Sequence, residues 1–137
     1  MDDIKKIVCK AGNVIIGDGR IVIQSMCNTD TLDVEGSVRQ CEALAAAGCE
    51  MIRLTTQGLR QVKALAQIRQ ALRAEGVTAP LVADVHFNSE VALEAAAGIA
   101  DKVRINPGNF SKDHEVAMAR LRELTAVCKE YGTALRI

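Results

Sequence analysis

The sequence predicts an α/β fold in which strands and helices alternate, as they do in a (β/α)8 barrel or a doubly wound sheet. Apolar residues with a helical period fill the gaps between short strand-like runs, and a glycine follows each predicted helix. The strand-like runs lie roughly 20 to 32 residues apart, which is the repeat expected of a βα unit. They centre on Val22, Ile52, Val82, Val103 and Leu135.

The chain begins with short β-segments and turns, before the first βα unit. Turns are expected at residues 11–13 and at residues 17–19, Gly-Asp-Gly. The second turn is predicted to close a hairpin, because Asp-Gly suits the positive φ that a tight connection requires. An N-terminal β-hairpin is therefore expected ahead of the βα repeat.

Four helices are predicted from apolar residues that recur with the helical period. They cover about residues 34–45, 59–75, 89–97 and 117–128. Their charged faces, such as the one that carries Arg69, Arg73 and Glu75, are expected to be solvated surface. Cys41 and Cys128 fall on apolar faces, where a free cysteine packs as a small hydrophobic residue.

The last predicted strand, residues 133–137, is not followed by a helix that could cover it. About four and a half βα units do not close a barrel, and the last strand would present an open edge. These features predict a fragment of a larger polypeptide. An open-sheet domain with the last strand at its centre is the alternative.

The composition is that of a soluble globular domain without a charge bias. Of 137 residues, 49% are hydrophobic, and 17 basic side chains balance 17 acidic ones. This balance predicts neither a nucleic-acid nor a membrane surface, and the absence of a long apolar run or a signal peptide predicts a cytoplasmic protein. Five cysteines without CxxC spacing argue against a disulfide framework and against a self-contained zinc site, so no metal ligands are expected. Cys27 lies in a loop where chemistry could occur, but packing is the favoured role.

Polar residues are paired at the ends of three predicted strands, and this pattern is the main functional signal. The pairs are Arg53 with Thr55, Asp84 with His86, and Arg104 with Asn106. Residues two apart on a strand point to the same face. Buried parallel strands are normally almost continuously apolar, so charges repeated at one place in successive strands indicate a site.

The predicted site lies where the carboxyl ends of the strands meet, the active face of a barrel. Three arginines on different strands suit a ligand with several negative oxygens, because a guanidinium binds phosphate through a bidentate fork. Asp84 and His86 could form an acid/base pair, or His86 could donate to a phosphate oxygen. The structural alternative is that Asp84 only neutralises an arginine. The residues expected at the site are Ser25, Asn28, Arg53, Asp84, His86, Arg104, Asn106 and Arg136.

Four motifs strongly resemble the 4-hydroxy-3-methylbut-2-enyl diphosphate synthase family of the non-mevalonate isoprenoid pathway. They occur in order over almost the whole chain, from about residue 12 to 137, and read SMCNTDT, IRLTTQG, PLVADVHF and KVRINPGNF. The resemblance implies an incomplete (β/α)8 TIM barrel of about four and a half βα units preceded by an N-terminal β-hairpin. It also implies a family reaction in which 2-C-methyl-D-erythritol 2,4-cyclodiphosphate is reductively opened with loss of water.

The resemblance assigns roles to the predicted site. Arg53, Arg104 and Arg136 would hold the cyclic diphosphate, with help from His86 and Asn106. Asp84 would lie close to the hydroxyl groups of the substrate or orient the histidine. The polar loop that carries Ser25 and Asn28 would contribute to binding.

The family's cofactor is not matched by this chain. In the family a [4Fe-4S] cluster is bound by three cysteines and a glutamate of a separate C-terminal iron–sulfur domain, and none of the five cysteines here fits that motif. Residues 1–137 are thus expected to be the N-terminal part of the substrate-binding barrel, inactive alone. The full-length enzyme is expected to be a homodimer that receives electrons from a flavodoxin or ferredoxin. Two alternatives remain: another barrel enzyme for phosphorylated substrates, similar to dihydropteroate synthase, and a non-catalytic half-barrel binding module.

Overall fold

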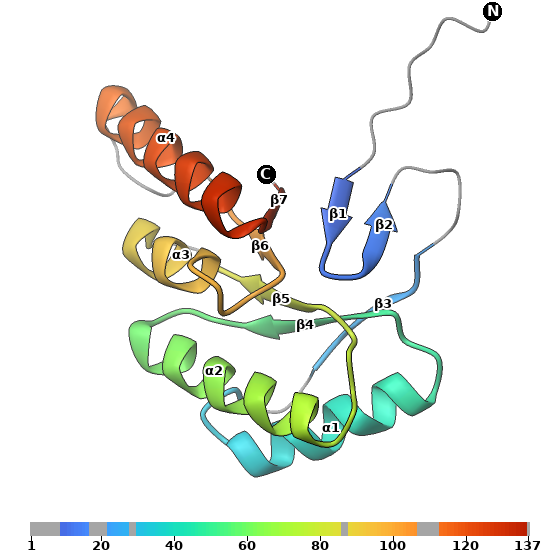
Figure 1. Ribbon diagram of the computed structural model, residues 1–137. Helices are drawn as coiled ribbons and strands as arrows, with labels where there is room; N and C mark the ends of the chain where they lie inside the picture. The colour runs from blue at the N-terminus through green and yellow to red at the C-terminus, as the bar shows by residue number, and fades with distance from the viewer. Residues whose placement is uncertain (1–8, 17–21, 28–29, 86–87, 107–112, 137) are drawn as a thin grey trace, which may run out of the picture.

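The computed structural model describes residues 9–16, 22–27, 30–85, 88–106 and 113–136 and has the predicted α/β architecture (Figure 1). The predicted alternation and the four predicted helices are confirmed. The elements are β1 (Cys9–Ala11), β2 (Val14–Ile16), β3 (Gln24–Met26), α1 (Val34–Ala46), β4 (Met51–Thr55), α2 (Leu59–Ala74), β5 (Leu81–Asp84), α3 (Ser89–Ala96), β6 (Lys102–Arg104), α4 (His114–Tyr131) and β7 (Ala134–Arg136).

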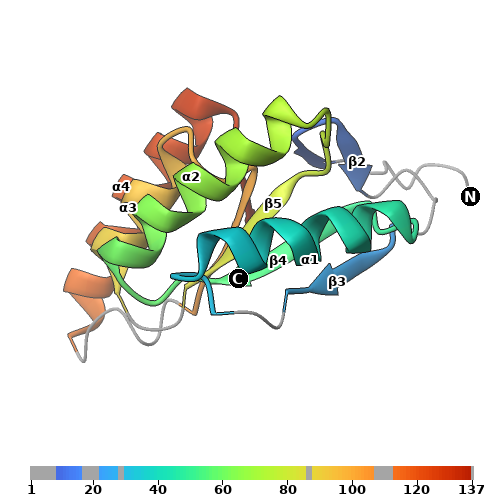
Figure 2. The ribbon, with the colours of Figure 1, turned by 90° about the horizontal axis from the view of Figure 1, so that it is seen from below.

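Five parallel strands form one sheet in the order β3-β4-β5-β6-β7, which is also their order in the sequence. A doubly wound sheet reverses its strand order at a switch point, whereas a (β/α)8 barrel places each strand beside the preceding one. The described strands show no reversal, so they form part of a barrel wall. The helices lie along one side of this wall, and the β1–β2 hairpin lies across the sheet from them (Figures 1 and 2).

The two faces of the sheet carry different residues, because side chains alternate along each strand. The helix-facing side forms the main core with apolar residues of the helices, including Ile52, Leu54, Leu81, Ala83 and Val103 of the strands and Leu65, Ile68 and Leu124 of the helices. On the opposite face, which we call the inner face, Met51, Val82 and Ala134 pack against Ala11 and Val14 of the hairpin. The hairpin therefore covers the inner face near the amino ends of the strands and leaves the carboxyl ends accessible.

The N-terminal hairpin is present, and the turn predicted at residues 11–13 joins its two strands. Antiparallel β1 and β2 are joined at Gly12 and Asn13, whereas the predicted turn at residues 17–19 lies outside the described residues. Gly12 has a φ of +57°, and a Cβ at this position would lie 3.0 Å from Cγ of Pro80. Both the conformation and the close approach therefore require glycine here.

The first strand of the parallel sheet lies further along the chain than predicted. The apolar run centres on Val22, yet β3 covers Gln24–Met26. The backbone decides this position: the carbonyl oxygen of Ile23 accepts hydrogen bonds from the N–H groups of Glu50 (2.8 Å) and Met51 (3.1 Å). Pairing with β4 thus places the strand at a more polar stretch, which the pattern of apolar residues does not predict.

The prediction that Arg69 and Arg73 are solvated surface was wrong. Arg69 Nη1 lies 3.3 Å from Asp101 Oδ1, and Arg73 Nη2 lies 3.3 Å from Asp101 Oδ2. The same carboxylate accepts a hydrogen bond from the backbone N–H of Leu81 at 2.9 Å, and Arg69 Nη1 donates to the carbonyl of Ile99 at 2.9 Å. Burial lowers the pKa of Arg73, and Asp101 opposes that shift. This Asp101 network ties α2 to the amino ends of β5 and β6.

The predicted packing role of the cysteines is confirmed for Cys27, Cys41 and Cys128, which are all buried. A hydrogen bond with Cys27, followed by burial, raises the pKa of Cys41, and burial raises the pKa of Cys128. Raised pKa values keep Cys41 and Cys128 as thiols and make them poor nucleophiles. None of the helices in the described part of the chain combines the length and the apolar character that a bilayer span requires.

Candidate anion-binding site

The strand register places the predicted polar residues in two rows on the inner face. One row follows Met26, Arg53, Val82, Lys102 and Ala134 across the sheet, and the next follows Thr55, Asp84, Arg104 and Arg136. Because parallel strands keep their carboxyl ends at one edge, the second row lies nearer the end of the sheet that forms the active face of a barrel. Residues that are 83 positions apart in the sequence are thus brought together (Arg53 to Arg136, 136 − 53).

Asp84 is the centre of this arrangement. Its residue is only 2% exposed, and its two carboxylate oxygens are held by two arginines from the neighbouring strands. Arg104 Nη1 donates to Oδ1 at 2.9 Å, and Arg53 Nε lies 3.6 Å from Oδ2. A buried carboxylate requires such partners, because removing its charge from water is costly. The ion pairs fix the spacing of the two guanidinium groups.

Arg53 retains unused binding capacity. Its Nε atom is buried and has no hydrogen-bond partner within the described residues, since 3.6 Å to the carboxylate of Asp84 is too long for a hydrogen bond. Its Nη2 atom contacts the thioether sulfur of Met26 at 3.6 Å, which is a weak acceptor. The side chain as a whole is 25% exposed, so the guanidinium is oriented by its neighbours and still accessible to a ligand.

The inner face carries an excess of positive charge. Arg53, Lys102, Arg104 and Arg136 point to this face together with one carboxylate, that of Asp84, so four cations and one anion give a net charge of +3 for the two described rows. Within the described residues, neither Lys102 nor Arg136 forms an ion pair. Such a surface favours a ligand with more than one negative oxygen.

Lys102 is absent from the predicted site, although the sequence contains a signal for it. It lies two residues before Arg104 and hence on the same face of β6. Burial is the main cause that lowers its pKa, and the neighbouring charges of Arg136 and Arg53 lower it further. The pattern of alternating polar residues therefore extends over three positions of this strand.

The remaining predicted residues are distributed differently. Ser25 pairs in register with Ile52, and Cys27, two residues later, belongs to the helix-facing core, so the side chain of Ser25 lies on the opposite face from Arg53. Asn106 is exposed and lies two residues after the end of β6. Asn28 and His86 lie outside the described residues. The structure thus brings together Arg53, Asp84, Arg104 and Arg136, and it separates Ser25 from them.

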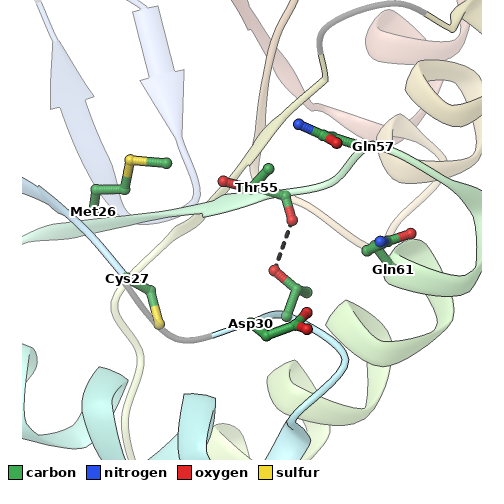
Figure 3. Close-up of a pocket in the computed structure, with 7 residues that line it drawn as sticks. Met26, Cys27, Asp30, Thr55, Gln57 and Gln61 are labelled. Atoms are coloured by element: carbon green, nitrogen blue, oxygen red, sulfur yellow. Dashed lines mark hydrogen bonds between the residues drawn. The ribbon is translucent and has the colours of Figure 1, made fainter.

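A cavity of about 480 Å³ lies at the carboxyl ends of β3 and β4. Figure 3 shows side chains from β3, the following loop, the end of β4 and the start of α2 around it. The hydroxyl of Thr31 donates to the carbonyl of Thr55 at 2.6 Å and holds the loop against β4. The lining residues are Met26, Cys27, Asp30, Thr31, Thr55, Gln57 and Gln61. Two of them, Met26 and Thr55, also belong to the inner-face rows, and Met26 contacts Arg53, so the cavity borders the inner face.

Comparison with models of known protein families shows to which family this chain belongs. The model of the GcpE TIM-barrel domain matches residues 6–137. The chain belongs to the GcpE TIM-barrel domain family. This membership agrees with the observed fold, in which five parallel strands represent part of an eight-stranded barrel.

Several curated relatives of this GcpE-family chain carry the same enzyme name. A 4-hydroxy-3-methylbut-2-en-1-yl diphosphate synthase (flavodoxin) of Chlamydia muridarum is 43% identical over 97% of the chain and 25% of its own length. The corresponding (ferredoxin) protein of Synechococcus sp. strain CC9311 is 47% identical over 92% of the chain and 36% of its own length. The chain thus spans between a quarter and little more than a third of the length of these two relatives.

One solved structure shares the fold of this GcpE-family chain at low sequence identity. It is the dihydropteroate synthase of Burkholderia cenocepacia, which superimposes with a TM-score of 0.60 at 16% identity over 85% of the chain and 43% of its own length. At this level of identity the similarity concerns the fold alone.

Proposed function

We propose that this chain supplies part of the diphosphate-binding surface of a 4-hydroxy-3-methylbut-2-en-1-yl diphosphate synthase. Such an enzyme converts 2-C-methyl-D-erythritol 2,4-cyclodiphosphate into the linear allylic diphosphate with loss of water. The observation that carries the proposal is the group of four cations around one buried carboxylate on the inner face. The names of relatives more than 40% identical to the chain support the same reaction.

In this proposal the arginines bind the diphosphate and Asp84 positions them. Arg104 uses Nη1 for Asp84 and keeps its other N–H groups for phosphate oxygens, and Arg136 lies next to it in register. Arg53 approaches the same ligand from β4 with a side chain that is 25% exposed. Asp84 prevents these guanidinium groups from moving apart under their mutual repulsion. Binding energy is thus available without reorganisation of the site when the ligand arrives.

Other predicted roles stay within the proposal. His86 would donate to a phosphate oxygen or act with Asp84 in proton transfer, and Asn106 would add a neutral donor beside Arg104. Asn28 would contribute from the loop after β3. The position of Ser25 on the helix-facing side supports a structural role for that residue instead.

The electrons for the proposed reaction would come from a [4Fe-4S] cluster of the whole enzyme, reduced by a flavodoxin or ferredoxin. The described residues of this chain do not fit such a cluster, because no three of their histidine, cysteine or acidic side chains are grouped as ligands. Residues 1–137 would accordingly form the N-terminal part of the substrate-binding domain, with the cluster held elsewhere and the enzyme acting as a homodimer.

The proposal is tested by calorimetric titration of the chain with 2-C-methyl-D-erythritol 2,4-cyclodiphosphate at fixed ionic strength. We expect saturable binding that weakens by about 10- to 100-fold in Arg104→Ala, since hydrogen bonds to charged groups contribute roughly 1.5–3 kcal/mol each. Arg39→Ala, which removes an exposed arginine of α1, is the matched control and should bind like the wild type. Circular dichroism of each variant verifies the fold.

Two results would count against the proposal. A folded wild-type chain that does not bind the cyclic diphosphate would show that these strand ends do not form the site. Equal affinities of Arg104→Ala and Arg39→Ala would show that binding does not involve the inner face. Titration with a dihydropterin tests the dihydropteroate-synthase-like alternative, for which binding of the pterin and indifference to the cyclic diphosphate are expected.

A further inference from the structure

Lys102 occupies an unusual position for a lysine. It opens β6 on the inner face, in register with Val82 and Ala134, which both pack under the hairpin in the inner apolar cluster. Its side chain is half-buried, like that of Arg104, which lies one row closer to the carboxyl edge. Lys102 therefore lies on the side of the charged surface that is further from the carboxyl ends of the strands.

The surroundings of Lys102 do not neutralise its charge. The groups that act on it from other elements are Arg136 of β7, Cys9 of β1 and Arg53 of β4. The two arginines lower its pKa and Cys9 opposes them, and none of the three is a carboxylate. The nearest acid on the inner face, Asp84, is held by two arginines, and Lys102 forms no ion pair within the described residues. A half-buried ammonium beside two guanidinium groups is destabilised unless an anion joins it.

We infer that Lys102 is a further anion-binding residue of this surface, whose ammonium binds phosphate oxygens from the row below Arg104. The inference rests on the proposed function. It specifies that two negatively charged groups of one ligand would be bound by cations of two different rows. Successive residues on one face of a strand lie about 6.6 Å apart, so the two rows present cations at two depths. A diphosphate can reach both depths at once, whereas a single phosphate group would meet only one.

The inference has a consequence for the pH dependence of binding. In the free chain, burial and the two arginines lower the pKa of Lys102, and a bound anion would raise it. Binding should therefore take up a proton over part of the alkaline range, and affinity should fall as the pH rises above the pKa of the free lysine. The arginines stay charged throughout this range, and histidine titrates well below it.

The experiment compares Lys102→Met, Lys102→Arg, Lys63→Met and the wild type, titrated with the cyclic diphosphate from pH 7.5 to 10. Lys63 is exposed on α2 and serves as the matched control. We expect Lys102→Met to bind about tenfold more weakly at pH 7.5 and to lose most of the alkaline pH dependence. Lys102→Arg should bind well at pH 7.5 and stay nearly independent of pH, because a guanidinium does not titrate there. Cys9→Ser isolates any contribution of the neighbouring thiol to the profile.

The outcomes separate this inference from the proposed function. If Lys102→Met binds like Lys63→Met while Arg104→Ala loses affinity, Lys102 does not bind the ligand and the proposed function stands. If the wild-type chain is folded and does not bind, both proposals fail. Should Lys102→Met fail to fold, Lys102→Arg decides: a pH profile equal to that of the wild type overturns the inference, and a flattened profile supports it.

Discussion

Removal of the Asp101 carboxylate should destabilise the chain strongly, although the residue lies far from the proposed ligand. Asp101 joins Arg69 and Arg73 of α2 to the backbone of β5, through contacts of 3.3, 3.3 and 2.9 Å. In Asp101→Ala the backbone N–H of Leu81 loses this acceptor, and Leu81 is fully buried. The two arginines lose their carboxylate at the same time.

The expected loss of unfolding free energy in Asp101→Ala follows from these contacts. An unsatisfied buried donor costs about 1–3 kcal/mol. The arginine side chains are 31% and 29% exposed, so solvent screens their ion pairs and we assign them about 1 kcal/mol in total. The sum is about 3 kcal/mol, and for a domain of this size it should lower the melting temperature by about 10 °C.

The assay is thermal and urea unfolding followed by circular dichroism, with two comparison variants. Asp101→Asn keeps an oxygen that can accept from Leu81 N–H and should lose only about 1 kcal/mol. Glu130→Ala removes an exposed acid of α4 and should leave stability within about 0.5 kcal/mol. If Asp101→Ala melts within about 2 °C of the wild type, the network does not stabilise the fold and the reasoning is wrong. If Asp101→Asn is as unstable as Asp101→Ala, the charge rather than the backbone acceptor is responsible.

Two further perturbations test other parts of the structure. Asp84→Asn raises the net positive charge of the inner face but releases the two arginines that Asp84 holds. We therefore expect calorimetry to show roughly 3- to 10-fold weaker binding of the cyclic diphosphate. Tighter binding would contradict the positioning role of Asp84. Gly12→Ala should destabilise by about 1–3 kcal/mol, because it combines a positive φ with a 3.0 Å approach to Pro80, as judged by urea unfolding. Gly48→Ala, at a φ of +97° with open space around it, carries the conformational strain alone, and an equal loss in both variants would exclude the role of close approach.

Local pattern predicted much of the candidate site. The two-residue period of strands placed Arg104 with Asn106 and Arg53 with Thr55, and the same rule applied one step earlier would have included Lys102. This rule cannot say which face of β3 is the inner one. Ser25 is adjacent to two residues of the inner face and itself faces the helices, because the register with β4 pairs it with Ile52. The choice between the two faces depends on contacts between strands, and those contacts are not local.

By itself, the sequence determined the α/β alternation and the helix positions to within a few residues. The signals for a helix are the spacing of its apolar residues, its capping residues and the glycine after its last turn, and all of these are local in the chain. Tertiary structure decided the strand order and the pairing of Asp84 with two arginines. It also turned Arg69 and Arg73, which read as solvated surface, into partners of Asp101. The physical reason is shared by these cases: each depends on groups more than 15 positions apart in the chain that meet only when the sheet and helices pack.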